Sequence, residues 1–363
     1  MKYHMKKEVC LIAQFPPPIH GLSKAVETLY NSELKEEFSF QKIDITNNKR
    51  FLKNFIEIFK STSDLYYFTI SQTIGGNFRD LIILSLLLIK KKRCIIHLHG
   101  GYYRKLIDCD MRWWQRQINY FLISKLSGVI VLSKSLKIIF ENMIDDEKIS
   151  IVSNCIDNEF LISDCDFEQK VQNINHKKVL SILYLSNFIK SKGYQEVLKL
   201  AKLEKERINL GEEKKYHFEF AGKFFEKSDQ DYFAKYIKEN DLEDIITYHG
   251  VVTGEKKRQL LKDCDIFILL TRYPNEGQPI SILEAMGNGM VVITTDHAGI
   301  PDIVKDSLNG IILEKGEDIT SIFTRLENIN YPFIMNNNRC VVNQQYSQEN
   351  YIENLRNVFL KIL

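Results

Sequence analysis

The sequence is poor in cysteine and has no long apolar run, and each shortage excludes a class of protein. Its seven cysteines, none of them paired at CxxC spacing, are too few for a disulfide framework in 363 residues. No segment reaches the ~18 apolar residues of a membrane-spanning helix, and the nearest, LIILSLLLI at 81–89, ends at Lys90. The opening MKYHMKKEVCLIAQF has too short and too mixed an apolar run for a secretory signal. We therefore expect a cytoplasmic protein in a reducing compartment, without a transmembrane span.

The overall composition indicates a globular protein of two domains. Hydrophobic residues make up 44% of the chain and charged residues 26%, which excludes a disordered chain, a collagen-like repeat and a coiled coil. At about 150 residues per domain, the length corresponds to two domains, each able to bury a core of its own.

One stretch of the chain is strongly basic, although the net charge is only +2. Residues 79–137 hold 12 Lys or Arg against 3 Asp or Glu, a local charge of +9 that leaves −7 for the remainder. A single run such as KKKR at 90–93 is typical of a solvated surface. A field of this size attracts polyanions, which include phosphate esters, anionic lipids and nucleic acid. Because no nucleic-acid-binding motif is present, we favour phosphate esters or lipids.

Short apolar runs alternate with helical patterns along most of the chain. Continuous apolar strands with helices between them indicate parallel sheets that are covered on both faces. The first set of predicted strands spans 9–15, 38–45, 65–70, 94–99, 128–132 and 150–153. The second set spans 179–185, 216–221, 245–249, 265–270, 291–295 and 310–313. We therefore predict an α/β fold of two doubly wound domains, with ligands bound in a cleft at the carboxyl ends of the strands.

The predicted domain boundaries follow from where this alternation stops. Residues 157–178 carry acids, Asn and Lys with little periodicity, and we place a linker at 166–178. The N-terminal domain then spans 1–165 and the C-terminal domain 179–346. The tail at 347–363 is predicted to be a helix that packs back on the N-terminal domain, because it carries an apolar stripe of Tyr351, Leu355, Val358, Phe359 and Ile362.

Two loops of the N-terminal domain follow predicted strands. In PPPIHG at 16–21, Gly21 would let a ligand approach the N-terminus of the next helix, where free N–H groups and the helix dipole favour phosphate. An ordinary strand-to-helix turn is the alternative. In HLHGG at 97–101, His99 would face the cleft and position or polarise a substrate oxygen. His97 points the same way, but no third ligand at a metal-site spacing accompanies the two, so we interpret His97 as a core residue.

Two loops of the C-terminal domain carry the charged candidates. Lys192 and Gly193, in SNFIKSKG at 186–193, open a helix. A lysine there opposes the helix dipole, which a bound anion would explain; a flexible surface lysine is the alternative. The run EGQPISILEAM at 276–286 places Glu276 in a loop and Glu284 on the helix that follows. Carboxylates at such an edge need partners, and sugar or ribose hydroxyls are suitable. Helix capping by Glu276 would not explain the whole run.

The run EGQPISILEAMGNGMVVITTDHAGIPDIV resembles the C-terminal domain of the family-4 retaining glycosyltransferases of the GT-B fold, with their E-x7-E signature as Glu276 and Glu284. PPPIHG, HLHG, SNFIKSKG and HAGIPDIV follow the family's order, so the resemblance covers nearly the whole chain. It implies two Rossmann-like domains that face each other across a cleft, the N-terminal one on the acceptor side and the C-terminal one binding the nucleotide sugar. It also implies transfer with retention at the anomeric carbon, without a metal or another cofactor.

The resemblance also implies roles for single residues. Glu276 would contact the donor sugar and Glu284 the ribose, while Lys192 would neutralise the departing diphosphate, whose charge develops in the transition state. His99 would face the acceptor side near the reacting carbon. The remaining donor-binding candidates are Gly21, Asn187, Val251, Val252, Gly277, Gln278, Pro279 and Ile280. Asn187 stands where the family usually has an arginine, so stabilisation of the diphosphate would rely on Lys192, backbone dipoles or another cation.

Aromatic residues interleave with the basic stretch, a combination that favours a membrane interface. Enzymes that this chain resembles often build polysaccharides on a diphosphate-linked lipid. We therefore predict peripheral association with the anionic inner face of the cell membrane, through a patch of Lys91, Lys92, Arg93, Tyr102, Tyr103, Arg104, Trp113 and Trp114. Core aromatics beside a solvated face are the alternative.

The resemblance thus predicts a bacterial glycosyltransferase of surface-polysaccharide biosynthesis, such as that of O-antigen or lipopolysaccharide. It would move a hexose or N-acetylhexosamine from a UDP-sugar, or alternatively a GDP-sugar, to a lipid-linked or surface-polysaccharide acceptor. Its expected partners are the nucleotide sugar, a lipid-diphosphate-linked glycan and an anionic membrane surface, and no nucleic acid. A nucleotide-sugar 2-epimerase, which shares the architecture, is one alternative. A catalytically degenerate homologue that still binds a nucleotide sugar is another, and Asn187 would suit it.

Overall fold

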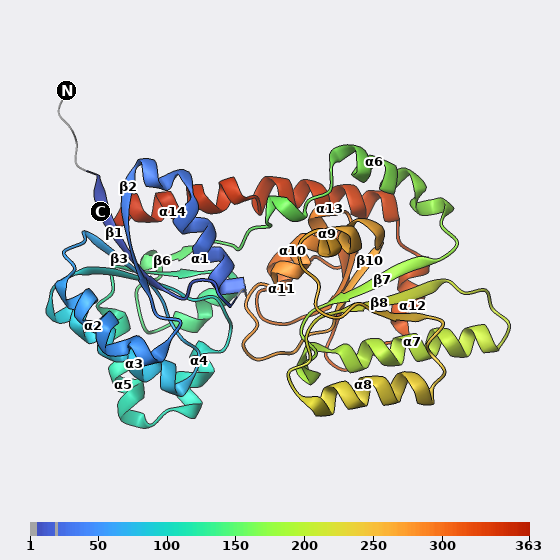
Figure 1. The fold of residues 1–363 in the computed structure, drawn as a ribbon, viewed down its shortest axis with the longest axis horizontal. Helices are drawn as coiled ribbons and strands as arrows, with labels where there is room; N and C mark the ends of the chain where they lie inside the picture. The colour runs from blue at the N-terminus through green and yellow to red at the C-terminus, as the bar shows by residue number, and fades with distance from the viewer. Residues whose placement is uncertain (1–5, 19–20) are drawn as a thin grey trace. The chain divides into compact units, whose positions relative to one another are not determined.

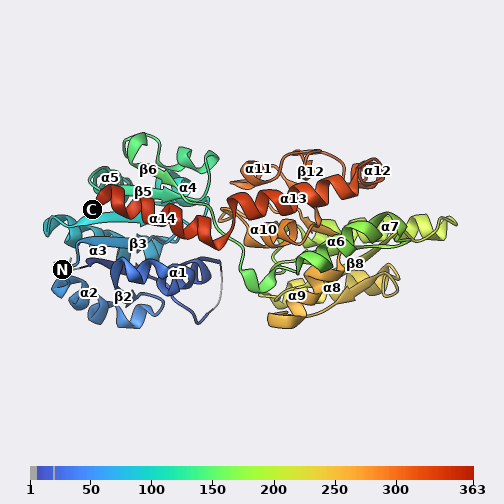
Figure 2. The same cartoon turned by 90° about the horizontal axis from the view of Figure 1, so that it is seen from above.

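The chain divides into two compact units. The computed structural model describes residues 6–18 and 21–363. Unit 1 comprises Met1–Cys155 with Gln348–Leu363, and unit 2 comprises Ile156–Ser347 (Figures 1 and 2). Within the described residues, each unit contains one six-stranded sheet whose strand pairings are all parallel. The prediction of two doubly wound α/β domains is confirmed.

Unit 1 is built on a sheet with the strand order β2-β1-β3-β4-β5-β6. Its strands are β1 (Lys7–Ala13), β2 (Phe38–Asp44), β3 (Leu65–Thr69), β4 (Arg93–His97), β5 (Gly128–Val131) and β6 (Ile149–Ile151). Its helices are α1 (Gly21–Asn31), α2 (Phe51–Lys60), α3 (Ile74–Ile89), α4 (Tyr103–Lys105), α5 (Trp113–Ser124) and α14 (Gln348–Ile362). The step from β1 to β2 runs opposite to the later steps, so right-handed crossovers put α1 on one face and α2, α3 and α5 on the other (Figure 1).

The C-terminal helix α14 completes the core of unit 1 on the face that α1 covers. Tyr351, Leu355 and Phe359 are each at most 2% exposed. The Tyr351 hydroxyl donates to the carbonyl oxygen of Ala25 at 3.2 Å. The Phe359 ring stands edge-on to that of Tyr67, with 6.0 Å between ring centroids. The apolar stripe read from the sequence is therefore the buried face of this helix.

Unit 2 is built on a sheet with the strand order β12-β11-β10-β7-β8-β9. Its strands are β7 (Leu180–Leu185), β8 (Tyr216–Ala221), β9 (Ile246–Tyr248), β10 (Ile266–Leu269), β11 (Val291–Thr295) and β12 (Gly310–Leu313). Its helices are α6 (Asp164–Asn173), α7 (Tyr194–Asn209), α8 (Lys227–Glu239), α9 (Gly254–Asp263), α10 (Ile280–Gly287), α11 (Ile300–Ile303), α12 (Ser321–Glu327) and α13 (Tyr331–Gln345). Figure 1 shows α7 and α8 on one face of this sheet and α6, α9, α10 and α13 on the other.

The linker prediction at 166–178 is wrong, because α6 and a short 3-10 helix, η7 (Ile174–His176), occupy these residues as part of unit 2. Phe167 and Ile174 are buried, and between them the buried Lys170 ammonium donates to the carbonyl oxygens of Leu261 and Asn288 at 3.1 and 3.0 Å. A lysine in the middle of the inward face hides the apolar periodicity from the sequence. The boundary of the units falls after Cys155 instead.

The twelve predicted strands are all present, each within two residues at either end. Their buried apolar side chains form the cores of the two sheets. Among the described residues, no helix combines the length and the apolar character that crossing a bilayer requires.

Candidate active site

The loop after β7 approaches the end of β10, its neighbour in the sheet. It passes through a short 3-10 helix, η8 (Lys190–Lys192), and Gly193 before α7 begins. Gly193 has φ +82°, and a Cβ at this position would lie 2.3 Å from the carbonyl oxygen of Leu270. The backbone N–H of Arg272 donates to the carbonyl oxygen of Ser191 at 2.7 Å. Only a glycine therefore allows the two loops to pack this closely.

Lys192 and Glu276, two of the three predicted catalytic residues, form an ion pair at this edge. Lys192 Nζ lies 3.2 Å from Glu276 Oε2, and the two side chains are only 16% and 10% exposed. The Thr271 hydroxyl donates to the same carboxylate oxygen at 3.2 Å. Lys192 Nζ also lies 5.1 Å from the ring centroid of Tyr273. The structure thus brings a cation, a carboxylate and an aromatic ring together at the carboxyl ends of β7 and β10.

Backbone hydrogen bonds fix the loop that carries Glu276. The Glu276 N–H donates to the carbonyl oxygen of Tyr273 at 3.0 Å, and the Gly299 N–H donates to that of Gly277 at 2.9 Å. The His297 Nε2–H also donates to the carbonyl oxygen of Tyr273, at 2.7 Å. The loop is therefore held from the side of β11 and α11. Beyond it, Gln278 is buried, Pro279 is the N-cap of α10 and Ile280 is the first residue of that helix.

Glu284 lies on α10 and has a different lysine as its partner. Its side chain is 5% exposed, and Lys257 Nζ of α9 donates to Glu284 Oε1 at 2.6 Å. Burial raises the pKa of Glu284, and the nearby Lys257 ammonium opposes that shift. Lys257 Nζ also sits 4.0 Å from the ring centroid of Phe160. Each glutamate of the predicted pair thus has a lysine of its own.

The structure separates the other donor-binding candidates of unit 2. Asn187 is exposed, and its carbonyl oxygen accepts a hydrogen bond from the Tyr184 hydroxyl at 3.0 Å. Val251 is 65% exposed, whereas Val252 is buried in the hydrophobic core. Of these two valines, Val251 presents its side chain to solvent, and the role of Val252 in the donor site stays a prediction.

The predicted residues of the N-terminal loops belong to unit 1. His97 is fully buried, and a 2.6 Å hydrogen bond joins its Nδ1 to the Tyr67 hydroxyl. Burial, with a smaller effect of His99, holds the pKa of His97 well below its usual value, so this ring is neutral. The interpretation of His97 as a core residue is confirmed.

His99 is half-buried, with its ring centroid 3.9 Å from that of His97. Gly21 is the exposed first residue of α1, and Ile19 and His20 lie outside the described residues.

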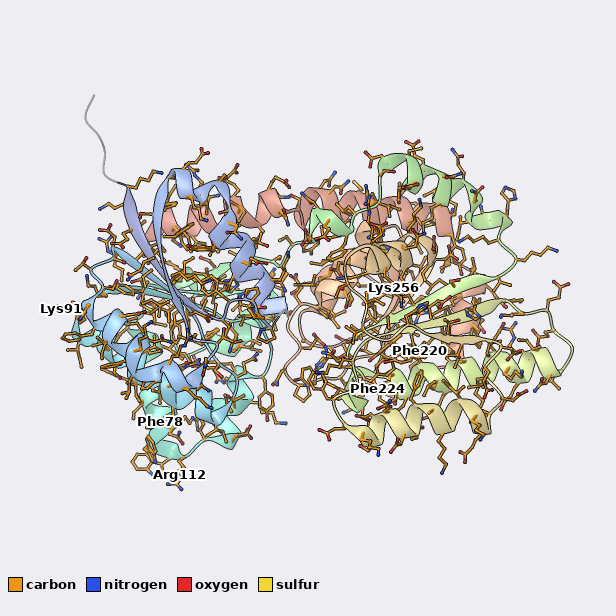
Figure 3. The ribbon with its side chains drawn as sticks, in the orientation of Figure 1. Phe78, Lys91, Arg112, Phe220, Phe224 and Lys256 are labelled. Carbon is orange, nitrogen blue, oxygen red and sulfur yellow. The ribbon has the colours of Figure 1, made fainter. Side chains whose placement is uncertain are left out.

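The predicted membrane patch is only partly on the surface. Trp113 is 77% exposed, and Lys91, labelled in Figure 3, is exposed at the rim of unit 1. Tyr103 is 1% exposed, so its place in the patch is wrong. Most of the remaining patch residues have polar partners within unit 1: Lys92 with the carbonyl oxygen of Thr62, Arg93 with that of Ile362, Tyr102 with Asp110, and Arg104 with Asp108. Trp114 is half-buried.

Sequence reasoning missed three residues that hold the charged pairs in place. Thr271 donates a hydrogen bond to Glu276, and the ring of Tyr273 lies beside Lys192. Lys257 pairs with Glu284. Thr271 directly follows the predicted strand 265–270, and this position at the carboxyl end was a usable signal. Lys257 sits in the charged stretch GEKKRQ, where nothing distinguishes it from its neighbours.

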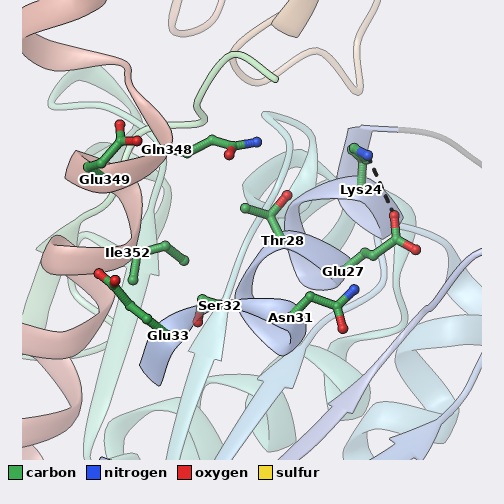
Figure 4. Close-up of a pocket in the computed structure, with 9 residues that line it drawn as sticks. All are labelled: Lys24, Glu27, Thr28, Asn31, Ser32, Glu33, Gln348, Glu349 and Ile352. Carbon is green, nitrogen blue, oxygen red and sulfur yellow. Dashed lines mark ion pairs between the residues drawn. The ribbon is translucent and has the colours of Figure 1, made fainter. Parts of the chain in front are cut away.

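Several pockets are lined by the described residues, and two of them bear on ligand binding. One of about 600 Å³ in unit 2 lies beside the η8 loop and is lined by Ser191, Gly193, Glu196 and Arg272 among others. The other, about 340 Å³, lies in unit 1 between α1 and α14 (Figure 4). Its polar lining includes the Lys24–Glu27 ion pair and none of the predicted site residues. In the described part of the chain, no three His, Cys, Asp or Glu side chains gather as a metal site, and metal independence stays a prediction.

Comparisons with known proteins match part of this chain to a family. Residues 166–330 match the family described as glycosyl transferases group 1. An uncharacterized glycosyltransferase of Methanocaldococcus jannaschii is 24% identical over 338 residues, which cover 87% of this chain and 80% of that protein. The amylovoran biosynthesis glycosyltransferase AmsK of Erwinia amylovora is 33% identical over 85 residues, which cover 22% of this chain and 21% of AmsK.

A solved structure extends the similarity to the whole fold. HepE of Anabaena, crystallised in complex with UDP, superposes with a TM-score of 0.74 at 16% identity, covering 98% of this chain and 100% of that one. The similarity to HepE supports the fold alone. Support for the activity comes from the matched family and from the relatives, some of which are polysaccharide-biosynthesis enzymes. Together with the two parallel sheets, these findings support a glycosyltransferase of the GT-B fold, in which residues 166–330 match the group 1 family.

Proposed function

We propose that the enzyme transfers a hexose or N-acetylhexosamine from a nucleotide diphosphate sugar to a surface-polysaccharide or lipid-linked acceptor, with retention and without a metal. The observation that carries the proposal is the Lys192–Glu276 pair, 3.2 Å apart at the carboxyl edge of the unit 2 sheet. It offers one ligand both a cation for phosphate and a carboxylate for hydroxyl groups. The amylovoran biosynthesis relative supports a polysaccharide acceptor, and the UDP bound to HepE supports a nucleotide sugar as the donor.

Donor binding would exchange the partners of this ion pair. A diphosphate oxygen would replace Glu276 beside Lys192, and the released carboxylate would accept hydrogen bonds from the sugar hydroxyls. As the bond between the anomeric carbon and the phosphate oxygen breaks, negative charge grows on the departing diphosphate. Lys192, held by its loop, would stabilise that charge without reorganisation. The acceptor oxygen would bond to the same carbon, while its O–H bond breaks and the proton passes to the departing diphosphate oxygen.

Glu284 would bind the ribose hydroxyls through its second oxygen. Lys257 holds Oε1 and neutralises the buried carboxylate. Charge-assisted hydrogen bonds from hydroxyls are short and strong at such a site. The exposed Val251 would lie against the base.

Two alternatives to this function are a nucleotide-sugar 2-epimerase and a catalytically degenerate homologue. The relatives are glycosyltransferases and do not favour the 2-epimerase. A degenerate homologue would bind the nucleotide without turnover, and the uncharged, exposed Asn187 is the feature that suits it. We also propose that the enzyme works at the inner membrane surface, where a lipid-diphosphate-linked glycan would be found.

Thermal stability with UDP, GDP, CMP and ADP, each with and without EDTA, tests the donor site. A nucleotide present at about 100 times its dissociation constant adds about 2.7 kcal/mol to the native state. We expect UDP to stabilise the protein most, with no effect of EDTA, and Lys192→Ala to weaken this stabilisation. Equal shifts with all four nucleotides, or no shift, would contradict the assigned donor site.

Turnover of Glu276→Gln tests the catalytic assignment. We expect turnover to fall about a hundredfold or more. The melting temperature should fall only modestly, because Gln keeps the shape of the side chain and can still accept the hydrogen bond of Thr271, although Lys192 loses its ion-pair partner. Glu314→Gln is the matched control, since Glu314 is an exposed glutamate at the same sheet edge and should keep wild-type turnover. Near-normal turnover of Glu276→Gln would remove Glu276 from the reaction.

A further inference from the structure

The helix α2 presents an apolar stripe to solvent. Leu52, Ile56 and Phe59 are 75%, 51% and 58% exposed. Their spacing of i, i+4 and i+7 puts them on one side of the helix. Single exposed apolar residues are common on protein surfaces, but a continuous stripe on a helix marks a contact with something else. The buried residues of α2 are Asn54 and Ile58, so large apolar side chains lie on the outward side of this helix as well as on its inward side.

The neighbouring helices α3 and α5 continue this pattern. Both pack in the same layer of unit 1, with α3 between α2 and α5. Phe78 and Ile89 of α3 are 53% and 79% exposed, and Phe78 is labelled in Figure 3. On α5, Trp113, Ile118 and Phe121 are exposed. We define the α2–α3–α5 face by these eight residues: Leu52, Ile56, Phe59, Phe78, Ile89, Trp113, Ile118 and Phe121.

The same three helices, with the residues that flank them, are strongly cationic. Residues 49–60, 74–93 and 112–125 together contain twelve Lys or Arg and two acids. Both acids are paired: Glu57 with Lys53 at 3.7 Å and the buried Asp80 with Arg79 at 2.8 Å. Basic groups also lie directly beside the apolar side chains, with Lys90 Nζ 5.1 Å from the ring centroid of Phe59.

The charge decides between the possible occupants of this face. A second copy of the chain would bring two cationic surfaces together, which costs several kcal/mol at an interface. An anionic bilayer offers phosphates to the basic side chains and an apolar interior to the rings between them. Trp113 is suited to the headgroup level, where tryptophan is enriched.

We propose that the α2–α3–α5 face docks on an anionic membrane surface. The apolar side chains enter the boundary between headgroups and acyl chains, while the surrounding Lys and Arg bind lipid phosphates. This inference rests on the proposed function. It adds which surface of unit 1 contacts the membrane. The surface differs from the sequence-predicted patch, because it excludes Tyr103 and takes three of its eight residues from α2.

Flotation of the full chain with vesicles tests the proposal. We compare phosphatidylcholine vesicles with vesicles that also contain phosphatidylglycerol, at low salt. The apolar variant is Leu52→Gln, Phe78→Ser, Trp113→Ser, and the charge variant is Lys91→Glu, Arg112→Glu; all five residues are exposed. Because a basic residue near such a surface is worth about fivefold in binding, the charge variant should bind anionic vesicles at least tenfold less well. The apolar variant should lose a similar factor.

Matched controls use exposed residues of unit 2. Leu210→Gln, Leu308→Gln, Phe333→Ser removes the same kind of side chain, and Lys178→Glu, Lys227→Glu reverses the same number of charges. Both controls should float like the wild type. Three results would overturn the proposal: a wild type that stays at the bottom with anionic vesicles, face variants that float normally, or a face that instead mediates a dimer in solution.

The outcome is separable from that of the proposed function. UDP-induced thermal stabilisation should be the same in the face variants as in the wild type, because the nucleotide candidates Lys192, Glu276 and Glu284 lie in unit 2. Conversely, Lys192→Ala should float normally. A wild type that floats with anionic vesicles but is stabilised by no nucleotide would refute the donor site alone. A wild type that is stabilised by UDP but does not float would refute the docking face alone.

Discussion

At the scale of single residues, each glutamate of the site forms an ion pair with a particular lysine. Glu276 is paired with Lys192 in a loop, and Glu284 with Lys257 between two helices. Glu284 is the more deeply enclosed of the two, with a side chain 5% exposed against 10%. An unpaired carboxylate in such a place is costly, so the partner lysine matters for folding as well as for ligand binding.

Lys257→Met should destabilise unit 2 by about 3 kcal/mol, because it leaves a buried charge without its partner. The double variant Lys257→Met, Glu284→Gln should recover most of that loss. The effect should depend on pH. Without Lys257, the folded-state pKa of Glu284 rises further above its unfolded value, so the stability of the single variant falls as pH rises between those two values. Denaturant unfolding at pH 5 and 8 measures this; equal losses for the single and double variants would contradict it.

Asp80 predicts a second pH dependence, in unit 1. Burial raises the pKa of Asp80 to about 6, although Arg79 and the Ser71 N–H oppose the shift. The folded state therefore holds a proton that the unfolded state has lost between about pH 4 and 6, so the unfolding free energy falls as pH rises through this window. The size is about 3 kcal/mol at most. Asp80→Asn should flatten this part of the stability profile, and a profile unchanged from wild type would be evidence that Asp80 ionises normally.

At the scale of elements, the approach of the η8 loop to β10 depends on one glycine. Gly193→Ala would add left-handed strain of about 1–2 kcal/mol and an overlap with the Leu270 carbonyl. We expect a clear loss of UDP affinity, because Lys192 is the preceding residue and would move with the loop. Gly211→Ala is the matched control: its φ is +94°, but no atom lies within 4 Å of the added carbon. The control should lose stability without losing UDP affinity, and equal affinities for both variants would exclude a positioning role for Gly193.

The elements were predictable where local pattern decides them, and not where packing between elements does. Strands of a parallel sheet are continuous apolar runs, and all twelve could be read. The meeting of Lys192 and Glu276 was foreseeable in outline, because both follow strands that end at one edge. Tyr103 could not be placed, since its hydroxyl bonds Asn119 on another helix. Lys170 obscured the helical pattern of α6 for a similar reason, because the carbonyl groups to which it donates belong to Leu261 and Asn288, which lie far away in the sequence.

At the scale of the whole molecule, unit 1 closes only with a helix from the far end of the sequence. Leu355 of α14 is fully buried in the core of unit 1, whereas Leu360 on the same helix is 44% exposed. Leu355→Ala should therefore cost about 2–5 kcal/mol, and Leu360→Ala less than about 0.5 kcal/mol. Calorimetry should show the loss in the transition of unit 1, with UDP stabilisation of unit 2 unchanged. Similar melting of both variants would mean that α14 does not support the core.

This discontinuity also sets an order of events during translation. The ribosome makes all of unit 2 between the last strand of unit 1 and α14. Domains generally fold as units during synthesis, the N-terminal one first. Here nascent unit 1 cannot complete its core at first. The apolar surface against which Tyr351, Leu355 and Phe359 pack stays exposed until unit 2 has left the ribosome. Unit 2 is continuous in sequence and can therefore fold first. Chaperones that bind exposed apolar surface would then bind unit 1, although unit 1 is synthesised earlier.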